Sequence, residues 1–162
     1  LPYLSGERTP HPDPHARGAF IGLSLRHEMN HLTRAVLEGV SFGLNDSLSL
    51  MRGLGIEPSS VILSGGGAQS GLWRQMLSDV FNTNCFTVNA HEGAAYGASL
   101  LGAVGIGSFD SVESASDHWI KQTEEIHPGE NAGKYQSLYS IYESLYPRLQ
   151  NTFHALAQYS EE

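Results

Sequence analysis

The sequence is poor in cysteine, in basic residues and in long apolar runs, and each shortage excludes a class of protein. Its single cysteine, Cys85, has no partner for an intrachain disulfide, which excludes a disulfide-stapled domain and predicts a reducing, cytoplasmic location. Only 9 Lys and Arg stand against 17 Asp and Glu, and they are scattered, so no nucleic-acid partner is expected. Apolar runs fall far short of the ~20 residues of a membrane-spanning helix, so no membrane partner is expected.

Several catalytic and phosphate-binding motifs are also missing. No Gly-Lys-Ser/Thr occurs, which excludes a P-loop. No G-x-S-x-G occurs, which excludes the nucleophile elbow of an α/β-hydrolase. The dinucleotide pattern G-x-G-x-x-G begins at Gly65 and Gly67 but has Ser70 in its third glycine position.

What remains is a chain of 162 residues that is 40% hydrophobic, which predicts a single globular domain. Residues 1–17 contain four prolines and predict a loop; residues 18–107 predict an α/β core and residues 108–162 a helical tail. Composition and spacing predict strands at 18–25, 60–63 and 85–88 and helices at 28–52, 71–82, 93–104, 110–120 and 132–158. Asp110 is the expected N-cap of the fourth helix, residues 121–131 a turn-rich connector, and Pro147 should kink or split the last helix.

Alternating strands and helices predict an α/β fold with a largely parallel sheet and helices on both faces. Three strands are few for such a sheet, and the chain does not begin with Met. We therefore expect the sheet to be incomplete, with further strands upstream of residue 1.

The stretch SGGGAQSGLW (64–73) places three glycines between a buried strand and a helix start. Free N–H groups and missing side chains in such a turn suit a nucleotide or anion, although a tight turn alone also explains glycine. Ser70 is the expected N-cap of the helix that follows.

Other polar residues have local explanations. His27 and His31 have a metal-ligand spacing but no third ligand is evident, so they are interpreted as surface histidines, and no metal ligands are assigned. Arg34 and Glu38 predict an i,i+4 ion pair. The tail tyrosines recur every three or four residues and predict a packing stripe, against the domain or a partner; they are Tyr135, Tyr139, Tyr142 and Tyr146.

Four segments together resemble the C-terminal part of the FGGY carbohydrate kinases: LSGERTPHPDPHARGAFIGLSLRH (4–27), AVLEGVSF (35–42), LSGGGAQSGLWRQMLSDVF (63–81) and EGAAYGASLLGAVGIG (92–107). Within the family they are most similar to the branch that phosphorylates xylulose. The positions that fit the family's second signature are Gly18, Phe20, Gly22, Leu23, His31, Leu32, Ala35, Val36, Leu37 and Glu38.

The resemblance implies an actin-like, RNase H-like α/β domain that carries the adenosine end of ATP. By position, Gly66 and Ser70 match residues that approach the nucleotide, and Trp73 is a candidate wall of its pocket. Ser70 stands where glycerol-kinase-like relatives have Asn. The remaining candidate nucleotide-binding residues are their neighbours in the turn, Gly65, Gly67, Ala68 and Gln69.

The resemblance also implies what this chain does not supply. Family members transfer the γ-phosphoryl of Mg-ATP to a sugar, here a pentulose, in a cleft shared with an N-terminal domain that binds phosphates. Their catalytic Asp lies upstream of the segment represented here, so no catalytic residue is assigned, and the chain alone is expected to be inactive. An incomplete sheet should expose an edge and apolar surface, so a homo-oligomer is expected.

Three other interpretations stay open from the sequence. One is a kinase of gluconate, ribulose or glycerol. Another is a nucleotide-binding or dimerisation module without catalysis. The third is a fragment of a Rossmann oxidoreductase, for which Glu92 is the candidate ribose ligand.

Overall fold

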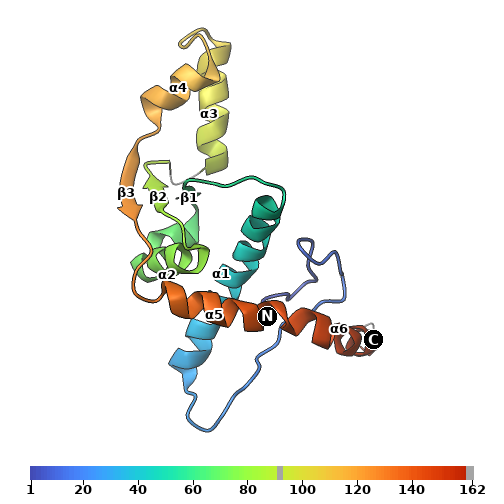
Figure 1. The fold of residues 1–162 in the computed structure, drawn as a ribbon. Helices are drawn as coiled ribbons and strands as arrows, with labels where there is room; N and C mark the ends of the chain where they lie inside the picture. The colour runs from blue at the N-terminus through green and yellow to red at the C-terminus, as the bar shows by residue number, and fades with distance from the viewer. Residues whose placement is uncertain (91–92, 160–162) are drawn as a thin grey trace. The chain divides into compact units, whose positions relative to one another are not determined.

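A computed structural model describes residues 1–90 and 93–159 (Figure 1). The chain divides into two compact units. The terminal unit comprises Leu1–Pro58 and the chain from Glu130 onward, and the central unit comprises Ser59–Gly129. These units cut across the sequence-based division at residues 17 and 107, because the first long helix packs with the C-terminal helices.

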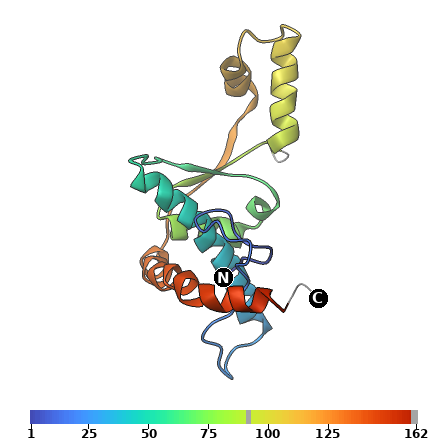
Figure 2. The same ribbon diagram turned by 90° about the vertical axis from the view of Figure 1, so that its right-hand side faces the viewer.

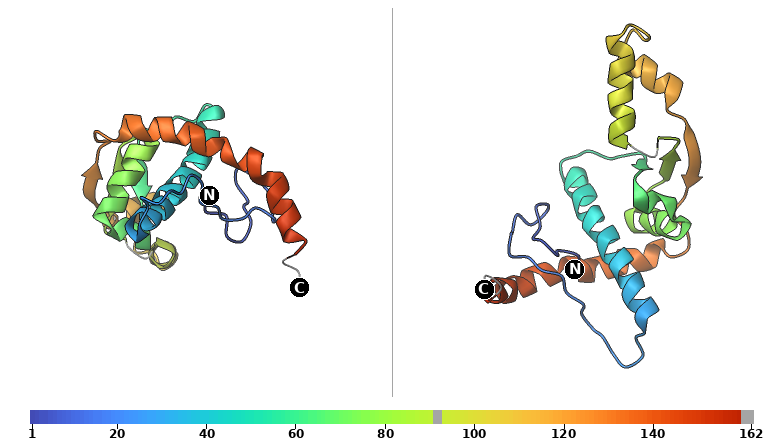
Figure 3. Two further views of the ribbon diagram at one scale, coloured as in Figure 1. Left: turned by 90° about the horizontal axis from the view of Figure 1, so that it is seen from below. Right: turned by 180° about the vertical axis from the view of Figure 1, so that it is seen from behind.

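Three helices form the terminal unit: α1 (Met29–Gly53), α5 (Ala132–Glu143) and α6 (Leu145–Ala157). The predicted first helix is confirmed, and its start is closed by His31, whose Nδ1 accepts the backbone N–H of Glu28 at 3.1 Å. The predicted split of the last helix is also confirmed at Ser144 (Figure 3). Pro147 lies in the first turn of α6, where no intrahelical N–H is required.

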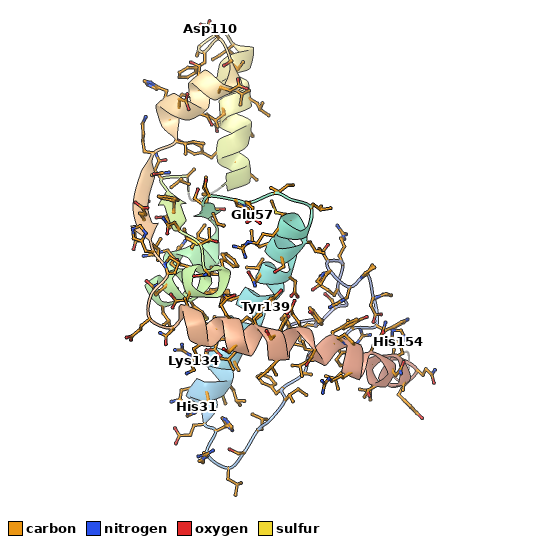
Figure 4. All side chains as sticks on the ribbon, viewed as in Figure 1. His31, Glu57, Asp110, Lys134, Tyr139 and His154 are labelled. Atoms are coloured by element: carbon orange, nitrogen blue, oxygen red, sulfur yellow. The ribbon has the colours of Figure 1, made fainter. Side chains whose placement is uncertain are left out.

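The tail tyrosines pack within the chain rather than presenting a free stripe. Rings of Tyr135, Tyr139 and Tyr142 on α5 surround Phe42 of α1, with centroids 5.2 to 6.0 Å away. Each ring keeps its hydroxyl paired, as buried polar atoms require. Tyr139 lies on α5 (Figure 4), and its hydroxyl donates to Asp46 Oδ1 at 2.7 Å.

The predicted Arg34–Glu38 ion pair is confirmed at 2.8 Å, and it belongs to the same helix contact. Arg34 Nη2 donates to the Tyr135 hydroxyl at 2.7 Å, and that hydroxyl donates to Glu38 Oε1 at 3.0 Å. The pair predicted for the surface of one helix therefore also joins α1 to α5.

The predicted strand at 18–25 is wrong. The segment is irregular apart from an isolated bridge between Gly18 and Pro2, and its apolar side chains Phe20, Ile21 and Leu23 are more than half exposed. β-propensity reflects packing against neighbouring strands, and no strand among the described residues pairs with this segment beyond the bridge.

The central unit contains a small sheet with helices (Figure 2). Its elements are β1 (Val61–Leu63), η1 (Gly66–Gln69), α2 (Gly71–Phe81), β2 (Cys85–Val88), α3 (Gly93–Gly105), α4 (Val112–Trp119) and β3 (Gln122–Ile126). The order is β1-β2-β3, and α3 and α4 lie side by side. The strands predicted at 60–63 and 85–88 and the helices at 71–82 and 93–104 are confirmed.

The third strand corrects two predictions. β1 and β2 are parallel as predicted, but β3 pairs antiparallel with β2, so the sheet is mixed rather than largely parallel. β3 lies where a turn-rich connector was expected. Apart from the buried Ile126, its residues are polar and exposed, as an edge strand tolerates, so the segment lacks the apolar pattern that predicts strands.

The N-cap of α4 is also corrected. Ser111, not Asp110, caps the helix, and its Oγ accepts the Ser114 N–H at 3.2 Å. Both residue types cap well, so residue type alone does not distinguish the two adjacent candidates.

α2 is held on the sheet by an apolar face and by buried polar contacts. Met76 and Val80 are almost fully buried. Ser78 Oγ donates to the Ile126 carbonyl at 3.1 Å, and Asp79 Oδ1 accepts the Gly129 N–H at 2.6 Å. These contacts fix the helix whose N-terminus follows the glycine turn.

Within residues 1–90 and 93–159, no helix has both the length and the apolarity needed to cross a membrane.

Candidate nucleotide site

The glycine turn connects the end of β1 to the start of α2. Gly65 has φ +82°, a backbone conformation that side chains disfavour, and the chain then makes one short 3-10 turn, η1. The predicted capping role of Ser70 is confirmed, because its Oγ accepts the Trp73 N–H at 3.3 Å. The turn is thus built by its own residues.

The three glycines have different surroundings. A Cβ added at Gly65 or Gly66 would meet no described atom within 4 Å, so the backbone there faces open space. A Cβ at Gly67 would come within 2.8 Å of the Trp73 ring. Gly67 is therefore needed for packing, whereas nothing among the described residues fills the space over Gly66.

A cavity of about 330 Å³ lies beside the turn, within the central unit. Its volume is in the range of small-ligand pockets. Neighbouring residues Leu63, Thr87 and Glu124 on the three strands form a row of its lining. The described residues that line it are Leu63, Ser64, Gly65, Ala68, Gln69, Arg74, Thr87, Val88, Ala90, Thr123 and Glu124.

The position of this cavity agrees with a general property of α/β sheets. It opens where the parallel strands β1 and β2 end, after Leu63 and Val88. Ligands of open α/β sheets bind at the carboxyl ends of the strands, where the loops supply backbone groups. The arrangement can therefore receive a small polar molecule against backbone, hydroxyl and amide groups.

Charged and hydroxyl groups line one side of the cavity. Arg74 of α2 donates from Nη2 to Glu124 Oε2 at 2.7 Å and from Nη1 to the Ala68 carbonyl at 2.8 Å. Two hydroxyls, Thr87 Oγ1 and Thr123 Oγ1, lie 2.9 Å apart across β2 and β3. The cavity thus combines one ion pair with neutral donors and acceptors.

The predicted site residues divide into two sets. Three of them, Gly65, Ala68 and Gln69, line the cavity. Gly66, Gly67 and Ser70 belong to the same turn but do not line the cavity, nor does Trp73 in the first turn of α2, whose ring packs against Gly67 instead.

Sequence reasoning missed the cavity residues on β2 and β3. Thr87 lies on a correctly predicted strand, and its position after the glycine loop in a parallel pair could have flagged it. Glu124 could not be found in this way, because β3 was not predicted. Arg74 was visible in the quoted motif, but its contacts depend on the β3 pairing.

Other candidate groups have local roles. His27 Nδ1 accepts the Ser24 N–H at 2.8 Å, which makes it a turn residue. Burial raises the pKa of Cys85 to about 11, so its thiol stays protonated and packs as an apolar group. Glu92, the candidate ribose ligand of the Rossmann interpretation, lies outside the described residues.

The described side chains do not form a metal site. Across the described part of the chain, no group of at least three His, Cys, Asp or Glu side chains is arranged to hold a metal ion. Within residues 1–90 and 93–159, the side chains therefore offer no ligand set comparable to the oxygen-rich sites that a magnesium ion prefers.

Comparison with known proteins gives one family. The model of the FGGY family of carbohydrate kinases, C-terminal domain, matches residues 1–106. Over 146 residues the chain is 43% identical to a xylulose kinase of Staphylococcus epidermidis, covering 90% of this chain and 29% of the relative. It is 36% identical to a gluconokinase of Bacillus subtilis, covering 98% of this chain and 31% of the relative.

A solved structure agrees with these relatives. The structure of ligand-bound xylulose kinase from Lactobacillus acidophilus matches with a TM-score of 0.87 at 28% identity, covering 96% of this chain and 32% of that one. The resemblance found in the sequence is therefore confirmed, together with the actin-like fold of these kinases. The chain spans about a third of the length of the relatives it matches.

Proposed function

Because the chain belongs to the FGGY family of carbohydrate kinases, we propose that it is the nucleotide-binding, C-terminal part of an ATP-dependent sugar kinase. The proposal treats residues 1–162 as one domain of that larger enzyme. Its chemistry is transfer of the γ-phosphoryl of Mg-ATP to a sugar hydroxyl, with release of ADP.

The observation that carries the proposal is the open turn at Gly65 and Gly66, next to a cavity at the ends of two parallel strands. A nucleoside needs backbone that it can approach closely, and the absent Cβ atoms give it that approach. The hydroxyl, amide and carboxylate groups around the cavity suit ribose hydroxyls and base nitrogens. We assign the nucleoside end of ATP to this turn, with Gly65, Gly66, Gly67, Ala68, Gln69, Ser70 and Trp73 as the binding residues.

The reacting end of ATP belongs elsewhere in this proposal. Phosphoryl transfer depends on positioning, on a residue that orients the attacking hydroxyl and on Mg²⁺ that bridges the phosphates. The described residues provide no metal-holding cluster, and the family resemblance puts the catalytic Asp upstream. This chain therefore binds and orients the nucleoside, while an N-terminal part supplies the base and the phosphate and sugar contacts.

We propose xylulose as the sugar, with D-xylulose 5-phosphate as the product. The support is the 43% identity to a protein named xylulose kinase. Gluconate is the second candidate, supported by the 36% identity to a gluconokinase. The cytoplasm is the proposed location, where ATP is available and a chain with a single buried thiol needs no disulfide.

Self-association is also part of the proposal. In the described sheet, β1 has a strand neighbour on one side only, and Ile62 is 59% exposed. An unpaired edge with apolar side chains favours pairing with another chain. Sedimentation should show concentration-dependent dimers or larger species, and a monomer at high concentration would contradict this.

A turnover assay tests the proposed division of labour. The 162-residue chain should bind ADP but should produce no ADP from Mg-ATP and D-xylulose, because the catalytic base and the phosphate and sugar contacts are assigned to the N-terminal part. Turnover at ordinary kinase rates by this chain would contradict the assignment. Titration with NADH, followed by its fluorescence, distinguishes the Rossmann interpretation: binding of NADH without binding of ADP would favour that alternative.

A further inference from the structure

Arg74 occupies an unusual place in the central unit, because one guanidinium joins three elements. Nη1 donates to the carbonyl of Ala68 in η1 at 2.8 Å, and Nη2 donates to Glu124 Oε2 on β3 at 2.7 Å. Arg74 itself belongs to the first turns of α2. A planar guanidinium with several fixed donors can make such divergent contacts, whereas a lysine ammonium presents a single point charge.

The arginine end of these contacts is largely shielded from water, which strengthens them relative to a pair with both partners exposed. The Arg74 side chain is 18% exposed and that of Glu124 is 49% exposed. Among the described residues, Arg74 Nε is buried and has no acceptor, so the two Nη contacts determine where the guanidinium lies. All three partners, Ala68, Arg74 and Glu124, line the cavity.

The glycine turn gains from such an attachment. Backbone hydrogen bonds close it internally, among them one from Ala68 N to the Gly65 carbonyl at 3.1 Å and one from Ser70 N to the Gly67 carbonyl at 3.2 Å. Because 3-10 hydrogen bonds have poorer geometry than those of an α-helix, a contact from α2 helps the turn to hold one shape. The Arg74 contact to Ala68 lies within this turn.

We infer that Arg74 is a positioning residue: by bonding Ala68 and Glu124 together, it holds the glycine turn against β3 in the geometry that receives the nucleoside. The inference rests on the proposed function for the identity of the ligand. Its structural half, the fixing of the turn by Arg74, is independent of any ligand. Glu124 acts through Arg74, since its carboxylate fixes the guanidinium that bonds the turn.

The test compares four variants of the full chain. Arg74→Met removes both contacts and keeps an unbranched side chain. Arg74→Lys keeps the positive charge but loses the planar guanidinium that bonds both partners. Glu124→Gln removes the charge alone. The matched control is Glu125→Gln, an identical change one residue further along β3 at a side chain that does not line the cavity and that pairs with His127 at 3.7 Å.

Amide hydrogen exchange of the ligand-free chain is the first measurement. In Arg74→Met, exchange at Ala68 and Ser70 should rise about tenfold, as expected for loss of hydrogen bonds to a charged group. Glu124→Gln should raise exchange about threefold, because Glu124 is half exposed. The rise in Arg74→Lys should lie between those of Glu124→Gln and Arg74→Met. The Ala115 amide in α4 should be unchanged, which separates a positioned turn from general destabilisation.

Affinity for ADP is the second measurement, by calorimetry, and it should fall in the same order, while Glu125→Gln matches wild type. Unchanged exchange at Ala68 and Ser70 in the Arg74 variants, or an equal effect of Glu125→Gln, would overturn the inference. If Arg74→Met does not fold, Glu124→Gln decides. If wild type binds no ADP, the proposed function fails, while the exchange data still decide the role of Arg74.

Discussion

Asp13 gives a sharp prediction about acid stability, because its buried carboxylate holds the N-terminal loop to α6. Oδ2 accepts the Tyr146 hydroxyl at 2.7 Å and lies 3.0 Å from His154 Nε2, while Oδ1 accepts the His15 N–H at 2.8 Å. The surrounding cluster includes the buried rings of Tyr3 and Tyr146. Asp13→Asn is the perturbation, since it keeps the shape and removes the charge.

The magnitude follows from the pKa of Asp13. Burial raises this pKa, but the hydrogen bonds from Tyr146, the His15 backbone and His154 outweigh burial and lower it from 3.8 to about 2. A carboxyl pKa that is lower in the folded state stabilises the fold above the unfolded pKa, and this stability is lost as pH falls through the folded pKa. Asp13 should therefore contribute about 2 kcal/mol at neutral pH, lost between about pH 4 and pH 2.

Urea denaturation of wild type and Asp13→Asn from pH 2 to pH 7 measures this contribution. The difference in unfolding free energy should be about 2 kcal/mol at pH 7 and should vanish toward pH 2. The control Asp110→Asn changes an exposed carboxylate (Figure 4) and should show no such difference. A difference that is independent of pH, or an NMR titration midpoint of Asp13 near 4, would refute the reasoning.

Substitutions at three further positions test separate parts of the structure. Burial, opposed by the hydrogen bond from Tyr139, raises the pKa of Asp46 from 3.8 to about 6. Its stabilising contribution is therefore present below pH 4 and is lost as pH rises through 6. The unfolding free energy of wild type should fall by about 3 kcal/mol in that window, whereas that of Asp46→Asn should not. Urea denaturation at each pH measures this difference. Ser70→Ala should cost about 1 kcal/mol, because the cap on the Trp73 N–H is lost, and Ser70→Asp should restore it in thermal unfolding. Gly67→Ala should lower stability by 1–3 kcal/mol through the clash with the Trp73 ring, and a melting temperature equal to wild type would contradict the packing.

Elements with strong local signals were predictable from the sequence. α1, α2 and α3 have helical spacing, caps or glycine stops, and β1 and β2 are short apolar runs. The Ser70 cap and the Arg34–Glu38 pair involve neighbours in sequence, so spacing alone predicted them. The glycine turn could be identified as a candidate site for the same reason.

What the sequence did not reveal depends on pairing between distant segments. Residues 18–25 have strand composition but find no ladder partner, whereas β3 has a polar composition and pairs with β2. Part of the cavity lining could not be predicted for the same reason, because the pairing of β3 with β2 brings Glu124 to Arg74. Packing of the tail tyrosines on α1 was likewise one of two possibilities until the helices were placed.

Binding of adenosine is the most direct test of the central claim that the glycine turn receives the nucleoside end of ATP. Adenosine is titrated into wild type and Gly66→Ala while backbone amide resonances of residues 64–73 are followed by NMR, with inorganic triphosphate as a parallel probe. A Cβ at Gly66 meets no described atom, so the variant should keep the wild-type melting temperature. The account predicts shifts in the turn with adenosine but not with triphosphate, and binding weakened about tenfold by Gly66→Ala, since the added methyl occupies the ligand's space. Equal adenosine binding by both proteins, or no shift in the turn of wild type, would contradict it.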